Sequence, residues 1–445
     1  MMKERNTQTS NQKQENSHET HHGEYTFMRQ VIKESPRKIE NILKKAVTIL
    51  VSGIAIGAIA AITFAKVLPY FEEEEPEVKV EFPDDEYVDP SQESNGDNEG
   101  TESVGGSSDS QDIQTIICPE TLTLEGFRQV YEDIVDVAEH AEKAMVIVQG
   151  VSSEVDWMNN SYENKTQISG VLVAETVLNY YILTEYRVME NVESIIVTFS
   201  DGATTMAEFV KYDPGTGLAV LKVVKKNVSE ATKNRIAIAT LGSSWTVKRG
   251  ETVIAIGSPT GYSGSLAYGM VTSTNNVKAS IDNQYHLLIT DILGDSEGSG
   301  VIISLDGEII GVMAQSFFME KSQNVLTAIS ISEVKKTIEK LINDEDITYL
   351  GVVGQDISDD LSGNTGIPAG IYVNSIEEDS PAMRAGIQNG DVIVGIGNSN
   401  IKTLSQFRSG LDYYNKGDKI TVSVMRRSTG DRYVQIVFDV TLGAL

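Results

Sequence analysis

The chain has 445 residues, and 40% of them are hydrophobic, so it is long enough to bury two or three separate cores. Its 64 acidic and 36 basic residues give a formal net charge of -28. Proteins that bind nucleic-acid phosphates present a basic stripe, and no such stripe follows residue 70, which excludes a nucleic-acid partner. The sequence contains no motif for a metal ion or an organic cofactor. Its single cysteine, Cys118, excludes an intrachain disulfide and leaves a buried thiol or an intermolecular bridge.

The first 70 residues predict a membrane anchor. Ala46 to Phe64 carries no charge, and the apolar segment 46–70 is long enough to cross about 30 Å of hydrocarbon as a helix. Basic residues are frequent before it, and Glu72 to Glu75 follow it, so the positive-inside rule places 1–45 in the cytoplasm and the remainder outside. The alternatives are a cleaved signal peptide, which usually has a shorter apolar run, and a buried core helix, which needs a polar face.

Residues 71–121 predict an acidic linker. Between Glu72 and Asp112 there are sixteen acidic residues against one basic residue, Lys79. Such a segment cannot bury a core, and repulsion between its like charges favours an extended chain. We therefore expect a stalk between the membrane and the folded part.

Residues 122–343 predict a mainly β domain. A helical pattern begins near Leu122 and ends in the apolar run from Ala144 to Val148. Ten short segments then alternate with turns rich in Gly, Pro, Asn and Asp, which is typical of an all-β barrel or sandwich. The expected strands are 169–174, 181–184, 194–199, 205–211, 218–222, 251–256, 266–273, 286–290, 300–303 and 308–314. An amphipathic helix is expected from Ile331 to Leu341.

Several collinear segments in this domain resemble one family. They are ISGVLV at 168–173, ILTEYRVMEN at 182–191, VTFSDG at 197–202, YDPGTGLAVLK at 212–222, LGSS at 241–244, VIAIGSP at 253–259, TD at 290–291 and LDGEIIGV at 305–312. In this order they are similar to the bacterial HtrA-type serine proteases. The resemblance implies a trypsin-like double β-barrel over 122–343, and the trimeric assembly common in that family.

Two of the three catalytic positions that the resemblance implies hold residues unable to do the chemistry. Where the family writes I-L-T-N-x-H-V, this chain has Arg187 in place of the histidine. A guanidinium stays protonated and cannot serve as a general base. Where the family writes D-L-A-V-L-K, this chain has Gly217 in place of the aspartate, and Asp213 corresponds to a different aspartate four residues upstream. The resemblance therefore implies a degenerate Ser-His-Asp site.

The serine position has two readings. Counting eight residues from Asp291, as in the family's T-D-x5-G-N-S, gives Ser299, although one residue of the motif is then missing downstream. Reading Gly294 to Gly298 as a variant of G-D-S-G-G gives Ser296 instead. We favour Ser299. Either reading adds the acidic residues Asp295 and Glu297 beside the loop that would hold an oxyanion, where negative side chains oppose catalysis.

Other residues could in principle replace the missing base. His140 falls in the first helical pattern and His286 alternates with apolar residues in a strand, so both are expected to be structural. Lys222 could serve a Ser-Lys arrangement, but it matches the lysine that ends D-L-A-V-L-K. We expect Arg187 to pair with Asp295 or Glu297 and to fill the degenerate site.

Residues 345–443 resemble a PDZ domain of the HtrA kind, with YLGV at 349–352 and SPAMRAGIQNGDVI at 380–393. The resemblance makes Tyr349, Leu350, Gly351 and Val352 the peptide-binding loop. Its backbone N–H groups would hold the terminal carboxylate of a peptide that ends in an apolar residue. Three apolar residues at helical spacing are assigned either to the groove wall or to the core: Leu404, Phe407 and Leu411.

The sequence thus favours a membrane-anchored, extracytoplasmic pseudoprotease that binds protein C-termini or unfolded segments through its PDZ domain. The alternative is an active HtrA-type serine endopeptidase in envelope protein quality control, with another residue restoring the catalytic triad. A purely structural envelope protein is the third possibility. Cleavage of an unfolded substrate separates the first two.

Overall fold

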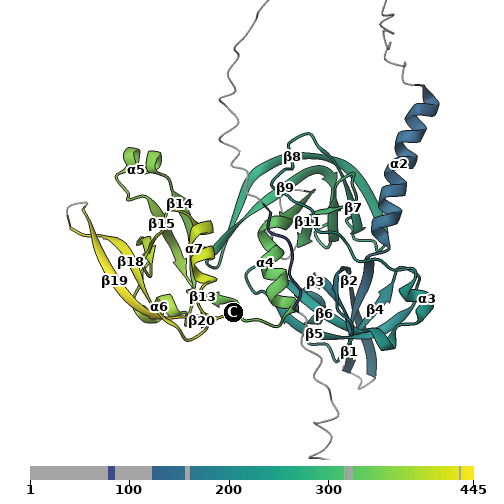
Figure 1. Ribbon diagram of the computed structural model, residues 1–445, viewed down its shortest axis with the longest axis horizontal. Helices are drawn as coiled ribbons and strands as arrows, with labels where there is room; N and C mark the ends of the chain where they lie inside the picture. The colour runs from purple at the N-terminus through teal and green to yellow at the C-terminus, as the bar shows by residue number, and fades with distance from the viewer. Residues whose placement is uncertain (1–78, 86–122, 156–160, 315–316, 318–323, 430–431) are drawn as a thin grey trace, which may run out of the picture. The chain divides into compact units, whose positions relative to one another are not determined.

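The computed structural model describes residues 79–85, 123–155, 161–314, 317, 324–429 and 432–445 (Figure 1). Contacts within Val78–Leu445 form one compact unit. Two closed β-barrels and a smaller open sheet make up most of this unit, so the described part of the chain is mainly β. The predicted cytoplasmic segment 1–45 and membrane span 46–70 lie outside the described residues. Among the residues that are described, no helix is long and apolar enough to span a membrane.

The first barrel closes six antiparallel strands in the order β1-β2-β3-β6-β5-β4. The strands are β1 (Met145–Val155), β2 (Ser161–Glu175), β3 (Asn179–Glu185), β4 (Ser194–Phe199), β5 (Thr204–Tyr212) and β6 (Leu218–Val224). Alternate residues of β4 point inward and are buried, as a half-exposed strand requires. Leu172, Ile182 and Leu221 are fully buried in this barrel.

The second barrel repeats this plan in the order β10-β11-β12-β9-β8-β7. Its strands are β7 (Thr252–Ser258), β8 (Ser265–Ser280), β9 (Asn283–Leu293), β10 (Ser299–Ile303), β11 (Ile309–Ala314) and β12 (Val325–Ser330). All ten segments predicted as strands fall on strands of the two barrels, with β8 and β9 longer than expected. Closure of both sheets answers the choice between barrel and sandwich, which periodicity left open.

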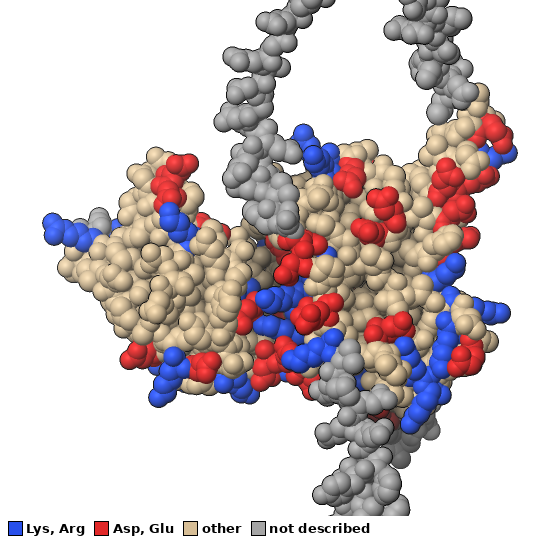
Figure 2. Space-filling model, viewed as in Figure 1, with Lys and Arg blue, Asp and Glu red and all other residues tan. Residues whose placement is uncertain are grey.

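Five helical segments accompany the strands of the two barrels. They are α2 (Leu124–Glu142), η3 (Tyr186–Met189), η4 (Lys225–Asn227), α3 (Glu230–Lys233) and α4 (Ile331–Ile342). Thr123 caps α2 by accepting a hydrogen bond from the Gly126 N–H. Phe127 and Val130, in its predicted apolar pattern, are about half exposed, whereas Ala138 is buried. In Figure 2, acidic side chains follow α2 on the visible face, while acids and bases are interspersed elsewhere.

The C-terminal domain is an open sheet with short helices. Its main sheet has the order β14-β15-β16-β18-β19, so β14 is an edge strand, and β17 pairs with β16. The strands are β13 (Thr348–Tyr349), β14 (Val352–Ile357), β15 (Gly370–Ile376), β16 (Val392–Ile396), β17 (Ser399–Asn400), β18 (Lys419–Arg427), β19 (Tyr433–Thr441) and β20 (Gly443–Ala444). The helices are α5 (Asp359–Thr365), α6 (Pro381–Ala385) and α7 (Leu404–Leu411). The buried Asp391 carboxylate accepts two hydrogen bonds of 2.7 Å from Arg426 on β18. Arg426 also donates to the Gly386 carbonyl at the end of α6, so this side chain joins α6 to β18.

Residues 79–85 depart from the extended acidic linker expected for 71–121. The Val80 N–H donates to Asn343 Oδ1 over 3.0 Å, and Asn343 Nδ2 donates back to the Val80 carbonyl over 2.9 Å. Phe82 packs on the core that α4 shares with both barrels. Asp85 accepts a hydrogen bond of 2.7 Å from Lys335, whose side chain is only 8% exposed. This segment therefore binds the folded body, because Val80 and Phe82 pack on the core and Asp85 pairs with Lys335 of α4.

We predict that Asp85→Ala lowers the free energy of unfolding by about 2–4 kcal/mol, because it leaves the nearly buried Lys335 ammonium without its carboxylate. Chemical denaturation of the full-length protein in mild detergent measures this loss. Glu81→Ala, on the exposed side of the same segment, is the matched control and should change stability by less than about 0.5 kcal/mol. Equal effects of the two substitutions would mean that Asp85 does not stabilise the fold through Lys335.

Candidate functional site

Three segments meet where the catalytic positions were expected. They are η3, which carries Arg187, the turn from Asp213 to Gly217, and the loop that precedes β10. The Tyr186 N–H donates to the Gly217 carbonyl over 2.8 Å, and Arg187 Nη2 donates to the Glu297 carbonyl over 3.0 Å. The structure thus brings the positions of Arg187, Gly217 and the loop together between the two barrels, as the resemblance implied.

Arg187 holds two carboxylates in this site. Its Nε lies 3.1 Å from Glu185 Oε2, and its Nη1 lies 2.5 Å from Glu297 Oε2. The Glu185 side chain is buried, that of Arg187 is 21% exposed and that of Glu297 is 74% exposed. The expected pairing with Glu297 is present, and the guanidinium joins the first barrel to the loop of the second. Glu185 was not foreseen, although a glutamate in the apolar segment ILTEYRV, where the family has Asn, was a usable signal.

Gly217 offers no orienting carboxylate. It has a φ of +75°, a conformation that glycine adopts without strain and an aspartate adopts less readily. The nearby Asp213 is turned into its own turn, accepting from the Gly215 N–H over 3.0 Å and from the Thr216 hydroxyl over 2.7 Å. Burial raises the pKa of Asp213, and these hydrogen bonds oppose the rise. Asp213 therefore closes a turn.

Neither candidate serine is placed as a nucleophile beside a base. Ser299 begins β10 and is 1% exposed, and its Oγ accepts a hydrogen bond of 2.9 Å from the Ser169 N–H. Ser296 is exposed in the preceding loop. The residue before Ser299 is Gly298, which has no hydroxyl. A Cβ at Gly298 would lie 2.8 Å from the Pro259 carbonyl oxygen, so this position excludes a side chain.

The loop before β10 has also used the N–H groups that an oxyanion would need. The Asp295 N–H donates to the Pro259 carbonyl over 3.0 Å, and the Gly298 N–H donates to the Asp295 carbonyl over 2.9 Å. The Glu297 N–H donates to Asp295 Oδ1 over 2.8 Å. Oxyanion stabilisation requires donors aimed at the reacting oxygen, whereas two of these donors are directed at Asp295 and the third at the Pro259 carbonyl.

The alternative bases lie elsewhere. His140 Nδ1 bonds the Asp136 carbonyl within α2 at 2.7 Å, and His286 Nδ1 bonds the Glu333 carboxylate of α4. That hydrogen bond raises the pKa of His286, against the effect of its partial burial. Lys222 forms an ion pair of 3.1 Å with Glu208 on the neighbouring strand. All three side chains have structural partners, so the expectation that they are structural agrees with their contacts.

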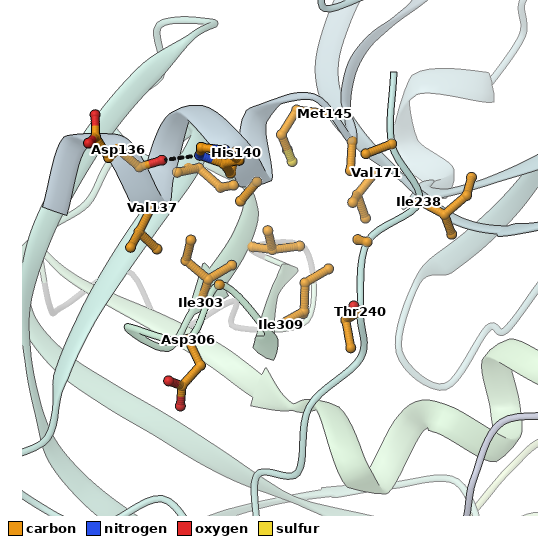
Figure 3. A pocket seen from close by; sticks show the side chains of 17 residues that line it. Asp136, Val137, His140, Met145, Val171, Ile238, Thr240, Ile303, Asp306 and Ile309 are labelled. Atoms are coloured by element: carbon orange, nitrogen blue, oxygen red, sulfur yellow. Dashed lines mark hydrogen bonds between the residues drawn. The ribbon is translucent and has the colours of Figure 1, made fainter. Parts of the chain in front are cut away.

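An apolar cavity of about 540 Å³ lies between α2 and strands of both barrels. Figure 3 shows the side chains of Val137, Ile303 and Ile309 around it, while the carboxylates of Asp136 and Asp306 point away from its centre. A site for catalysis or for a polar ligand needs polar groups that converge on one point, and this cavity lacks such a group at its centre. It is separate from the Arg187 cluster.

The predicted peptide-binding loop between β13 and β14 already holds a carboxylate. The N–H groups of Leu350, Gly351 and Val352 all donate to Asp282, at distances between 2.5 and 3.0 Å. Gly351 has a φ of +94°, and a Cβ there would lie 2.3 Å from the Ser380 Cβ, so only glycine fits. The sequence identified these three donors but not Asp282, because nothing local marks the partner of a distant loop.

The helix beside this loop was predicted correctly, but its apolar residues belong to the core. Leu404, Phe407 and Leu411 of α7 are all fully buried among residues of the C-terminal domain. Of the two assignments made from the sequence, core packing is the one observed. Arg408, on another face of α7, donates to the Thr348 carbonyl over 3.0 Å and to Asp412 over 2.9 Å.

Two barrels followed by this small open sheet define a trypsin-like domain with a C-terminal PDZ domain. The trypsin-like peptidase domain family matches residues 168–312, and the PDZ domain family matches residues 348–435. A probable periplasmic serine endoprotease DegP-like from Halomonas elongata is 30% identical over 273 residues, which are 60% of this chain and 55% of that protein. The serine protease Do-like HtrB from Bacillus subtilis is 28% identical over 324 residues, which are 66% of this chain and 68% of that protein. In both of its domains the chain is therefore similar to HtrA-type proteases.

Solved structures agree with this fold. The HtrA-type protease AlgW with tripeptide is similar to 70% of this chain over 97% of its own length, with a TM-score of 0.51 and 24% identity. At that identity the likeness shows the fold alone. The chain spans about half of the length of the DegP-like relatives that it matches, so the match does not transfer their activity.

We predict that Arg187→Ala lowers the free energy of unfolding by about 1–3 kcal/mol, because the guanidinium faces the buried Glu185 carboxylate. Glu297→Gln removes only the exposed end of the same cluster and should cost less than about 1 kcal/mol. Denaturant titration of both variants beside the unmodified protein gives the comparison. Unchanged stability of Arg187→Ala would show that the cluster does not hold the barrels together.

Proposed function

We propose that this protein is a membrane-anchored, extracytoplasmic member of the HtrA family that does not cleave peptide bonds and instead binds protein C-termini or unfolded segments. The observation that carries the proposal is the position of Arg187 between Glu185 and Glu297. The cation occupies the place of the general base and is itself held by two carboxylates. Periplasmic relatives and the charge pattern around the predicted span 46–70 support the extracytoplasmic side.

Each step of acyl transfer lacks its group in this site. Attack requires a base that takes a proton from the serine hydroxyl, and a guanidinium cannot accept one at neutral pH. The tetrahedral intermediate requires preorganised N–H donors, which here point at Asp295 and Pro259. The Ser299 hydroxyl is buried and faces the Ser169 N–H. A substitution that restored the base alone would therefore leave the site without oxyanion donors and without an accessible serine hydroxyl.

Peptide binding requires only the features that remain in the C-terminal domain. Leu350, Gly351 and Val352 direct three N–H groups at one carboxylate, and β14 is the edge strand beside them. A peptide can add to that edge as a further strand while its terminal carboxylate takes the three N–H groups. The HtrA-type protease AlgW was solved with a tripeptide, and the proposal extends such binding to this chain. Trimeric assembly, implied by the family, would present several such domains together.

We predict no turnover of unfolded casein by the full-length protein in mild detergent, with trypsin as the positive control. Ser296→Ala and Ser299→Ala variants, purified in the same way, separate residual turnover from a contaminant. Turnover that one of these substitutions abolishes would identify the nucleophile. It would also replace the proposal by the alternative, an active endopeptidase in envelope protein quality control.

A second prediction concerns repair of the site. The double substitution Arg187→His and Gly217→Asp restores the side chains of base and orienter. We nevertheless expect casein turnover to stay at background, because Ser299 is buried and N–H groups of the loop before β10 are engaged by Asp295 and Pro259. Circular dichroism of the variant must first show a native fold. Turnover above that of the unmodified protein would mean that this loop is competent and that only Arg187 and Gly217 silence the site.

A further inference from the structure

The turn between β8 and β9 reaches the PDZ loop with its carboxylate. Ser280 and Asn283 pair across the end of this hairpin, so Ile281 and Asp282 form its tip. Asp282 is 0% exposed and has a φ of +54°, a conformation rare for a residue other than glycine. Ser280 Oγ donates to the Gly215 carbonyl over 2.8 Å, which fixes the base of the tip on the first barrel. The carboxylate is therefore presented by a turn whose first residue is hydrogen-bonded to the first barrel.

The contacts of Asp282 are those of a peptide terminus. Its carboxylate accepts the three N–H groups of the loop, and its own N–H donates to the Val352 carbonyl over 2.7 Å. Ile281 forms an antiparallel bridge with Val353 on β14. A bound peptide would use the same groups: a carboxylate on the loop and a backbone strand antiparallel to the edge.

The second strand of the hairpin, β9, also contacts the peptide groove beyond the carboxylate-binding loop. Gln284 Nε2 donates to Asp356 Oδ2 over 3.2 Å, and Asp356 Oδ1 accepts the Leu404 N–H, at the start of α7, over 2.7 Å. Contacts of β9 with α7 and of β8 with β14 place the hairpin against both walls of the groove. A cavity of about 200 Å³, lined by Ile281, Gln284 and Arg408 among others, remains between the hairpin and α7.

We propose that Asp282 is an internal ligand of the carboxylate-binding loop, which keeps the peptide groove of the PDZ domain closed until a peptide C-terminus displaces the β8–β9 turn. The proposal rests on the peptide-binding function proposed above and adds its regulation. Displacement exposes a carboxylate that is now fully buried, so only a ligand that replaces all three N–H contacts can open the groove. A free C-terminus does so, whereas an internal peptide segment has no carboxylate at that point.

Because Asp282 competes with the peptide for the loop, the apparent affinity for the peptide is that of the open form multiplied by the fraction of molecules whose groove is open. Asp282→Asn preserves the shape and the tolerance for a positive φ, but its amide nitrogen faces N–H donors and its charge is absent. The substitution should therefore open the groove without deleting a binding residue. Val277→Thr, an exposed position on β8, is the matched control. Gly351→Ala abolishes the loop itself, because a Cβ meets Ser380.

The first measurement is hydrogen exchange of the backbone amides of Leu350, Gly351 and Val352 in the full-length protein without peptide. We expect these amides to be protected in the unmodified protein and in Val277→Thr, and to exchange at least tenfold faster in Asp282→Asn. Equal exchange in all three proteins would overturn the internal contact, whatever the peptide-binding result.

The second measurement is fluorescence anisotropy with five fluorescein-labelled decapeptides that end in Ala, Val, Ile, Leu or Phe, and with their C-terminal amides. We expect Asp282→Asn to bind at least one free-acid peptide tenfold or more tightly than the unmodified protein, with no binding of the amides or by Gly351→Ala. Equal affinity of Asp282→Asn and the unmodified protein would overturn the closed groove while leaving the proposed function intact. Faster exchange in Asp282→Asn with no binding by any variant would instead refute peptide binding and reduce Asp282 to a structural link.

Discussion

A buried charge is stable only when partners surround it, and three sets of buried charges in this chain join separate parts of the structure. Arg187 and Glu185 link the first barrel to the loop before β10. Asp282 links the second barrel to the PDZ domain, and Lys335 holds residues 79–85 on α4 through Asp85. Each link is specific, because removal of one member leaves the other in a site with little water.

The same constraint applies to the cleft between the two barrels. Polar groups in a cleft between two barrels need hydrogen-bond partners or water. Here the guanidinium of Arg187 fills that place and is compensated by Glu185 and Glu297, while Asp295 takes up the N–H groups of the loop. The fold thereby keeps its packing, and the PDZ loop, with its three N–H groups, is the part that retains binding chemistry.

Much of this could be predicted from the sequence, because strands, turns and family motifs are local. The ten strand segments and the N–H groups of Leu350 to Val352 were identified in this way. The sequence also predicted that Arg187 pairs with Asp295 or Glu297, and Glu297 is the observed partner. Apart from the pairing of Glu185 with Arg187, the contacts that the sequence missed join residues far apart in the chain. Asp282 reaches a loop about 70 residues away, and Asp85 reaches Lys335 across 250 residues. The high negative charge of 71–121 led to the prediction of an extended linker, although Val80 and Phe82 in this segment are apolar, alternate with charged residues and pack on the core.

The most direct measurement of the central claim, that the cleft holds an ion cluster and no reactive serine, is labelling with a fluorophosphonate probe. Such a probe forms a covalent bond with a serine only when a base and an oxyanion site activate that hydroxyl. We expect intact-mass spectrometry of the full-length protein to detect no adduct under conditions that label trypsin completely. An adduct that maps to Ser296 or Ser299 would contradict the account, because it would show that a nucleophile is activated beside Arg187.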